Sequence, residues 1–231
     1  IKIDNVVIEV IIMMDDKKSK VLTIILVVII VVIVGVLSYL GYVALKDKKV
    51  EDTYTQAANE FEKKVAGSPE KSKGSNSTLN SVNVSLDKSD RQQMEGYNVI
   101  GTIEIPKVDL KCAILEEVTP RSIEIAVGMM YTTAGLNEPG NTVIYGHNYR
   151  NKLFFSRNDE LQTGDEIRIL DESGRKITYE IFNIFETTMT DTTFYTRTAE
   201  ITNGKVEVTL STCTDDASET DRRLIIQARE K

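Results

Sequence analysis

The sequence predicts a mainly β domain with short helices in its C-terminal part, and three observations predict it. Short runs that alternate apolar and polar residues recur through residues 96–231. Glycine turns separate the runs, as Gly164 and Gly174 do on either side of residues 166–170. The runs are too short and too evenly spaced for helices, and this spacing is typical of an antiparallel sandwich or small barrel.

The first element is an apolar segment, residues 21–45, that contains no charged residue. It is longer than the ~20 apolar residues that cross a bilayer, so it predicts a transmembrane helix. A cleaved signal peptide would have only about 7–15 apolar residues and a small-residue cleavage site, whereas Lys46 follows here directly. We expect an uncleaved anchor, with residues 1–20 before it. Lysines flank both ends, so charge alone does not set the orientation.

Two segments follow the anchor, within residues 46–95. Apolar residues recur at three- and four-residue steps and predict a short amphipathic helix that packs on the domain as a stalk: Val50, Tyr54, Ala58, Phe61 and Val65. Residues 66–90 are rich in Ser, Asn, Lys and Gly, and we expect a flexible spacer. The domain is expected to begin near Gly96. Near the N-terminus, before the apolar segment, Met13 resembles a natural start, and residues 1–12 are expected to have little functional meaning.

Within the domain, alternation predicts half-buried strands with these apolar sets: Ile103 and Ile105; Val108, Leu110, Cys112 and Ile114; Ile177, Tyr179 and Ile181. Between the second and third sets, Thr119 can cap a helix that has Pro120 at its first position. We expect one or two helical turns over residues 121–127, ended by Gly128.

The last two predicted strands place a thiol beside a guanidinium. In residues 206–213 the apolar residues share one face, which leaves Cys213 on the other. In the final strand Arg223 also faces away from the apolar set, whereas Arg222 does not. If the residues between are a loop joining antiparallel neighbours, Cys213 and Arg223 lie opposite each other, with Cβ atoms about 5 Å apart.

These residue types suit acyl transfer. Only a thiolate attacks a carbonyl, and a nearby cation stabilises it. His147, the only histidine, follows the apolar run of residues 142–145 and can carry a proton to a departing amine. An arginine can hydrogen-bond the developing oxyanion. Simpler roles exist for each: a lone histidine is often structural, and arginines guard strand edges. Cys112, at core parity, is expected to be a buried small hydrophobe.

The sequences Thr-Leu-Ser-Thr-Cys at residues 209–213 and Tyr-Gly-His-Asn at residues 145–148, with the arginine that opens the final strand, closely resemble the sortase family of cysteine transpeptidases. The resemblance covers about three-fifths of the chain. It implies His147 as general acid/base, Cys213 as nucleophile and Arg223 as oxyanion or substrate clamp. Thr212 is a weaker candidate for lining the substrate groove.

The same resemblance implies an eight-stranded closed β-barrel and a single-pass protein of Gram-positive cell membranes, with the N-terminus cytoplasmic and the catalytic domain, residues 96–231, outside. It implies cleavage of a C-terminal sorting signal of LPxTG type on surface proteins. A peptidoglycan precursor or pilin lysine then supplies the acceptor amine. The two motifs favour class B, although residues 185–205 are short for the helical insertion of that class.

Composition excludes other classes of protein. The net charge is −7 with no long basic run, which argues against nucleic acid as a partner. Two distant cysteines and one histidine do not form a zinc cluster or a disulfide scaffold. No cofactor is expected; some sortases bind calcium, but the acidic residues of the loop, Asp215, Asp216, Glu219 and Asp221, form no recognisable ligand pattern.

Two alternatives stay open. A cysteine hydrolase that transfers the acyl group to water would use the same site residues. A membrane-tethered β-domain that binds wall components would leave Cys213 inert.

Overall fold

The structure, a computed structural model, describes residues 2–67, 91–214 and 221–231, with side chains from residue 20 onward. The chain forms two compact units, Ile1–Lys49 and Val50–Lys231. Helix α1 (Lys2–Gly67) provides the described part of the first unit and continues into the second. The predicted spacer, from residue 68 onward, and the loop acids at 215, 216 and 219 lie outside the described residues.

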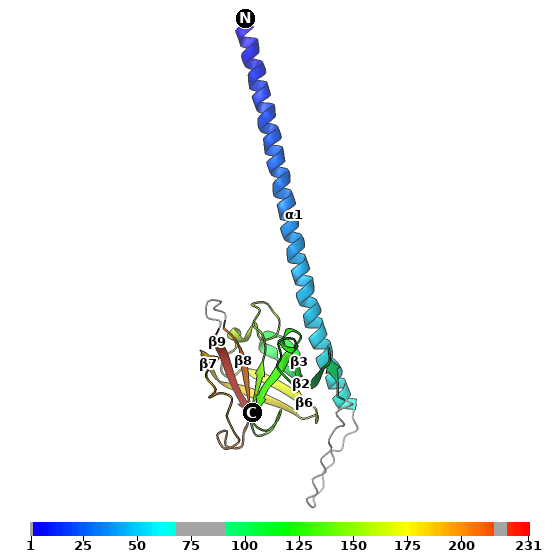
Figure 1. The fold of residues 1–231 in the computed structure, drawn as a ribbon, viewed down its shortest axis with the longest axis vertical. Helices are drawn as coiled ribbons and strands as arrows, with labels where there is room; N and C mark the ends of the chain where they lie inside the picture. Colours follow the sequence, from blue (N-terminus) through cyan, green and yellow to red (C-terminus); the bar gives the residue numbers. More distant parts are fainter. Residues whose placement is uncertain (1, 68–90, 215–220) are drawn as a thin grey trace, which may run out of the picture. The chain divides into compact units, whose positions relative to one another are not determined.

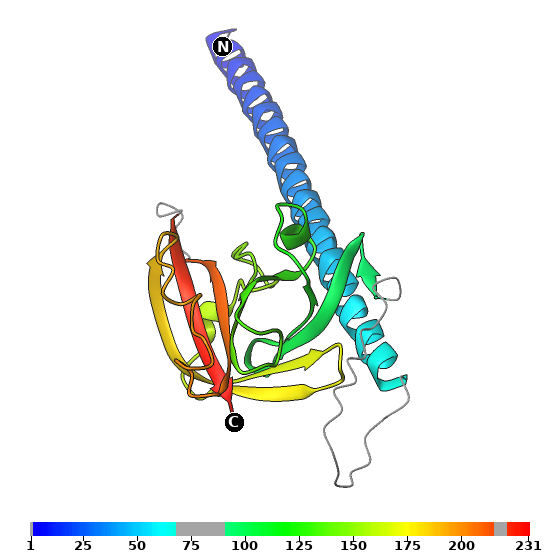
Figure 2. The ribbon, with the colours of Figure 1, turned by 60° about the horizontal axis from the view of Figure 1, so that its bottom comes forward.

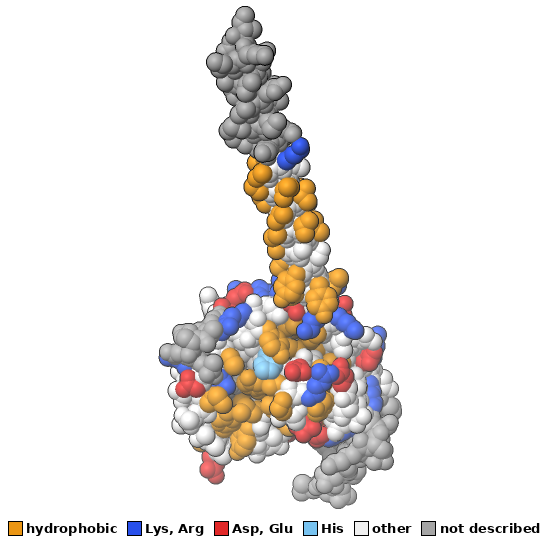
Figure 3. Space-filling view, turned by 45° about the horizontal axis from the view of Figure 1, so that its top comes forward, with side chains coloured by type: hydrophobic (Ala, Val, Ile, Leu, Met, Phe, Trp, Pro, Cys, Tyr) orange, Lys and Arg blue, Asp and Glu red, His pale blue; other side chains and the backbone are white. Residues whose placement is uncertain are grey.

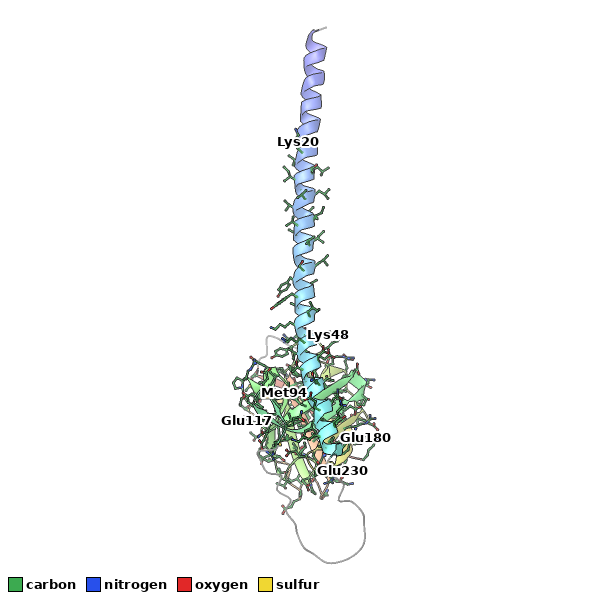
Figure 4. The ribbon with its side chains drawn as sticks, turned by 90° about the vertical axis from the view of Figure 1, so that its right-hand side faces the viewer. Lys20, Lys48, Met94, Glu117, Glu180 and Glu230 are labelled. Atoms are coloured by element: carbon green, nitrogen blue, oxygen red, sulfur yellow. The ribbon has the colours of Figure 1, made fainter. Side chains whose placement is uncertain are left out.

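The first unit contains a helical segment that is long and apolar enough to cross a membrane. An 18-residue window in Lys20–Gly67 has a mean hydropathy of 3.4, and none of that window is buried within the protein. Its apolar side chains project on all sides of the helix between Lys20 and Lys48 (Figure 4). A helix that is apolar all round is suited to lipid rather than to one packed face.

The described residues of the second unit form a β-barrel with three short 3-10 helices (Figure 1). Its strands are β1 (Gln93–Met94), β2 (Tyr97–Ile105), β3 (Leu110–Leu115), β4 (Val127–Thr132), β5 (Gly140–Tyr145), β6 (Glu166–Asp171), β7 (Lys176–Thr188), β8 (Val206–Cys213) and β9 (Arg222–Glu230). The 3-10 helices are η2 (Pro106–Val108), η3 (Ser122–Glu124) and η4 (Asn158–Glu160).

The strands follow the order β1-β2-β3-β4-β5-β8-β9-β7-β6, and β2 also pairs with β6. This second pairing closes β2 to β9 into an eight-stranded barrel, while β1 remains a short extra strand on β2 (Figure 2). Most neighbours are antiparallel, but two pairs are parallel, β3 with β4 and β5 with β8. The predicted mainly β class and closed eight-stranded barrel are confirmed.

Strand β4 was not predicted. The sequence placed residue 127 at the end of a helix, whereas Val127 is a buried strand residue that pairs with Ile114. Only the 3-10 helix η3 forms before it. Its N-cap is Arg121, without a side-chain cap bond, although the Thr119 hydroxyl accepts a hydrogen bond from the Ser122 amide over 3.0 Å. Gly128 is required because a Cβ atom there would lie 2.8 Å from the Glu117 carbonyl oxygen.

The end of α1 belongs to the barrel unit. Tyr54, Ala58 and Phe61 are at most 3% exposed and form part of the core, and the Tyr54 ring lies 5.3 Å from that of Phe154. The predicted amphipathic helix is therefore present and packs on the barrel. The compact unit begins at Val50 rather than near Gly96, because this helix buries its apolar face in the core.

Parity in the last strands is as predicted. Val208, Leu210 and Ile226 point into the barrel and are fully buried. The opposite face of β5, β8 and β9 is also covered, since residues 189–205 pass over it. Here Val143, Phe194 and Ile225 form a small hydrophobic group that we call the outer cluster.

Candidate active site

The candidate site lies where β5 and β8 end and β9 begins. Cys213, the last residue of β8, pairs directly with Arg223 of β9. Because paired residues of neighbouring strands point to the same face, both side chains are on the outer face of the barrel. The predicted opposition of thiol and guanidinium is confirmed.

His147 reaches the same place through the parallel pair β5–β8. Tyr145 pairs with Ser211, and the Gly146 amide donates to the Ser211 carbonyl over 3.2 Å. Continuing this register sets His147 beside Cys213. A histidine and a cysteine 66 positions apart in the chain are thus brought to adjacent strand ends.

Gly146 permits this close approach. A Cβ atom at residue 146 would lie 2.7 Å from the Phe155 ring and 2.9 Å from a Val127 methyl group. The backbone amide of Phe155 then donates to the His147 carbonyl over 3.1 Å. The histidine is therefore held on a backbone whose neighbours leave no room for a side chain at the preceding position.

The His147 ring is half-buried among aromatic rings, with centroids 4.7 Å from Tyr149 and 5.9 Å from Tyr145. Figure 3 shows this single histidine at the surface, next to an area of hydrophobic side chains. Burial lowers the pKa of His147, the charge of Glu124 opposes this shift, and the charge of Arg223 adds to it. The neutral imidazole is therefore favoured, which suits a group that must accept a proton before it donates one.

Sequence reasoning missed two residues that contact Cys213. The Tyr145 hydroxyl lies 3.7 Å from the Cys213 sulfur, and the Asn148 amide group donates to the Cys213 carbonyl over 3.2 Å. Burial and Cys213 raise the pKa of Tyr145, so its phenol stays protonated. The alternation of faces along β5 could have identified Tyr145, because it lies on the same outer face as Val143. Asn148 lies beyond the end of β5, so this alternation does not predict where its side chain points.

Thr212 is placed differently from the expectation that it lines a groove. Its side chain is fully buried, and its hydroxyl donates to the Gly146 carbonyl over 2.8 Å. The residue therefore ties β8 to the backbone just before His147, because its parity is opposite to that of Cys213. This placement does not fit direct contact with a substrate.

Cys112 is distinct from Cys213. It is fully buried in β3, and burial raises its pKa to about 12. Cys213 is half-buried at the site, and both thiols are free. The expected division between a core cysteine and an accessible one is confirmed.

Among the described residues, no group of three or more His, Cys, Asp or Glu side chains is arranged to hold a metal ion. The chemistry that the described site offers is that of a cysteine nucleophile, an imidazole and a guanidinium at one end of a closed β-barrel. This combination suits cysteine-dependent acyl transfer.

Comparison with known proteins identifies the family. A sequence model described as "Sortase domain" matches residues 103–231, so the chain belongs to the sortase family of cysteine transpeptidases. Sortase D of Bacillus subtilis is 30% identical over 165 residues, which cover 71% of this chain and 75% of that protein.

Solved structures of sortases are also similar to this chain. A Clostridium perfringens sortase D5 transpeptidase has a TM-score of 0.56 and 26% identity, over 79% of this chain and 99% of that one. Sortase A of Listeria monocytogenes, with a TM-score of 0.51 and 20% identity over 58% of this chain and 87% of that one, shares the fold. Class B, which the motifs favoured, does not appear in the names of these three relatives.

Proposed function

We propose that this sortase is anchored in a cell membrane by residues 21–45, with the N-terminus in the cytoplasm and the barrel outside. It cleaves the C-terminal sorting signal of a surface protein, of LPxTG type, and joins the new C-terminus to an amine of the cell wall or of a pilin. The single observation that carries the proposal is the pairing of Cys213 with Arg223 at the strand end that His147 also reaches.

The reaction has two balanced steps. Neutral His147 first takes the proton of the Cys213 thiol. The thiolate then attacks the carbonyl carbon of the scissile peptide bond, a carbon–sulfur bond forms, and the carbon–nitrogen bond breaks as His147 gives that proton to the departing amine. An acceptor amine then attacks the thioester and loses a proton to neutral His147, and the carbon–sulfur bond breaks to return the thiolate. Arg223 donates hydrogen bonds to the oxyanion in both steps.

Two relatives with class D names, from Bacillus subtilis and Clostridium perfringens, favour class D over class B for this chain. Their names alone support this subclass, and the matches extend over more than 70% of this chain.

Mass spectrometry of the purified protein after exposure to a library of sorting-signal peptides tests the proposal. We expect a thioester on Cys213 whose mass gives the preferred motif, and none on Cys213→Ala. Adding an amine should shift the product from free acid to amide. Hydrolysis that no amine diverts would identify a hydrolase, and wall binding without any thioester would identify a non-catalytic binding domain.

A further inference from the structure

Residues 189–205, which join β7 to β8, cover the outer face that carries the site. Phe194 is 2% exposed and packs with Val143 and Ile225 in the outer cluster, and Tyr195 packs half-buried against it. Ile225 lies two positions after Arg223 on the same face of β9. The outer cluster therefore continues the surface on which Cys213 and Arg223 lie.

Tyr195 sits at the edge of this surface in a defined orientation. Its hydroxyl donates to the Met130 sulfur over 3.6 Å, and its ring meets that of Tyr131 edge-on at 6.1 Å. Burial raises the pKa of Tyr195, and the charge of Arg223 opposes the rise, which agrees with a place near the guanidinium. Met130 and Tyr131 of β4 are about 40% exposed, so the three side chains offer an apolar surface to a peptide.

Asn141 holds the segment at Phe194. Its side chain is 1% exposed, its amide nitrogen donates to the Phe194 carbonyl over 2.9 Å, and its oxygen accepts from the Thr209 hydroxyl over 2.9 Å. Because both ends of the amide have partners, its orientation is fixed. The backbone just before Tyr195 is thus joined to the start of β5.

Glu207 holds the segment at Arg197. Its carboxylate is 1% exposed and binds two arginines, Arg197 through Nε at 2.6 Å and Arg229 through Nε at 2.8 Å. Arg197 belongs to the covering segment, whereas Arg229 belongs to β9. A buried carboxylate is costly unless paired, so this ion pair draws the segment onto β8.

We propose that Asn141 and the Arg197–Glu207 ion pair are positioning residues that hold Tyr195 against the outer cluster, on the face of the barrel that also carries Arg223, so that the apolar wall for the substrate peptide is formed before the peptide binds. This inference rests on the proposed function. Neither anchor reaches the reacting atoms, and both act through the backbone on either side of Tyr195. A preformed wall lowers the entropy cost of ordering the segment when the peptide binds. Loss of an anchor should therefore weaken substrate affinity.

Steady-state kinetics with one sorting peptide tests the proposal through two matched variants of the full chain. Arg197→Ala and Arg229→Ala each remove one arginine from the same buried carboxylate and leave the other. We expect Arg197→Ala to raise KM by about tenfold with little change in kcat, because the lost contacts stabilise the bound substrate and the transition state equally. Arg229→Ala should leave KM within about twofold of wild type. Tyr195→Ala should raise KM as Arg197→Ala does, and the double variant should add little.

Two further measurements separate positioning from general damage. Alkylation of Cys213 by iodoacetamide should be as fast in Arg197→Ala as in wild type. Hydrogen exchange of the amides of residues 194–197 should be faster in Arg197→Ala than in Arg229→Ala. If Arg197→Ala does not fold, Arg197→Lys is the second variant. Lysine keeps the charge but lacks the planar guanidinium that bonds the carboxylate at two points, so KM should rise by a smaller factor.

Equal KM values for the two arginine variants, or full additivity of Arg197→Ala with Tyr195→Ala, would overturn the positioning role. Unchanged exchange in residues 194–197 would overturn the anchoring itself. A wild-type chain that forms no thioester refutes the proposed function instead, and the exchange comparison still decides whether the anchors hold the segment.

Discussion

Arg222 and Arg223 are adjacent in the chain but point to opposite faces of β9. Arg222 forms an ion pair with Glu186 of β7 at 2.7 Å, and both side chains are at least 40% exposed. Arg223 pairs across the strands with Cys213. Two neighbouring arginines therefore have different roles, and the difference follows from the two-residue period of a strand.

Arg223→Ala should lower kcat by about 10²–10³, the cost of one lost oxyanion donor. Arg222→Ala should have a small effect, because an exposed ion pair contributes only about 0–1 kcal/mol. Arg223→Lys should restore activity in part, since lysine keeps the charge but lacks the planar fork. Kinetics with one sorting peptide measures all three; a crippled Arg222 variant beside a normal Arg223 variant would contradict the register of β9.

The two cysteines should respond oppositely to substitution. Cys213→Ala should abolish turnover and leave the melting temperature near that of wild type, whereas Cys112→Ala should stay active and lose about 1–3 kcal/mol of stability as a core truncation. Iodoacetamide should label Cys213 first, because Cys112 is fully buried with a pKa near 12. Equal loss of activity at unchanged stability in both variants would refute the assignment.

A chain that begins at residue 96 should be far less stable than one that begins at residue 46. The shorter chain lacks Tyr54 and Phe61, which are 2% and 3% exposed in the core. Losing one buried aromatic side chain costs about 3–5 kcal/mol, and a domain has only about 5–15 kcal/mol in total. Thermal unfolding of both chains measures this; matching melting temperatures would mean that the helix adds nothing to the barrel.

His147 should make stability depend on pH. The unfolded histidine has a pKa of about 6.5, and the folded value is lower, mainly because of burial. As pH falls below about 6.5 the unfolded chain takes up the proton first, so stability declines until the pH passes the folded pKa. Denaturant midpoints from pH 8 to 5 should fall more for wild type than for His147→Gln, and parallel curves would contradict the shift.

The sequence predicted those parts of the fold and site that follow from local patterns. Alternation identified the faces of β8 and β9, and so the opposition of Cys213 and Arg223. Pattern reasoning failed where long-range packing determines the local structure. Val127 was predicted to end a helix, but its pairing with β3 places it in a strand. Thr212 resembled a groove residue by its place in the motif, while its parity buries it.

The helix near Tyr54 shows the same limit. Its apolar face was visible in the sequence, but how much of the core it fills depends on the barrel surface that receives it. Asn148 could not be predicted either, because its hydrogen bond to the Cys213 carbonyl depends on the path of the loop that follows β5. Asn141 and Glu207 carry no signal of their own, since one partner of each, Phe194 or Arg197, comes from residues 189–205.

The parallel pairing of β5 with β8 also bears on how the protein folds. His147 follows β5, and Cys213 ends β8 66 positions later in the chain. Such pairings form slowly because the entropy of closing a long loop is lost before the strand contacts form. Partly folded chains, in which hairpins such as β6–β7 exist but β8 has not docked, hold Cys213 away from its imidazole. If Cys213 is the nucleophile proposed above, the thiol should become competent only once the barrel is complete, and nascent chains should be inert toward the peptides that surround them.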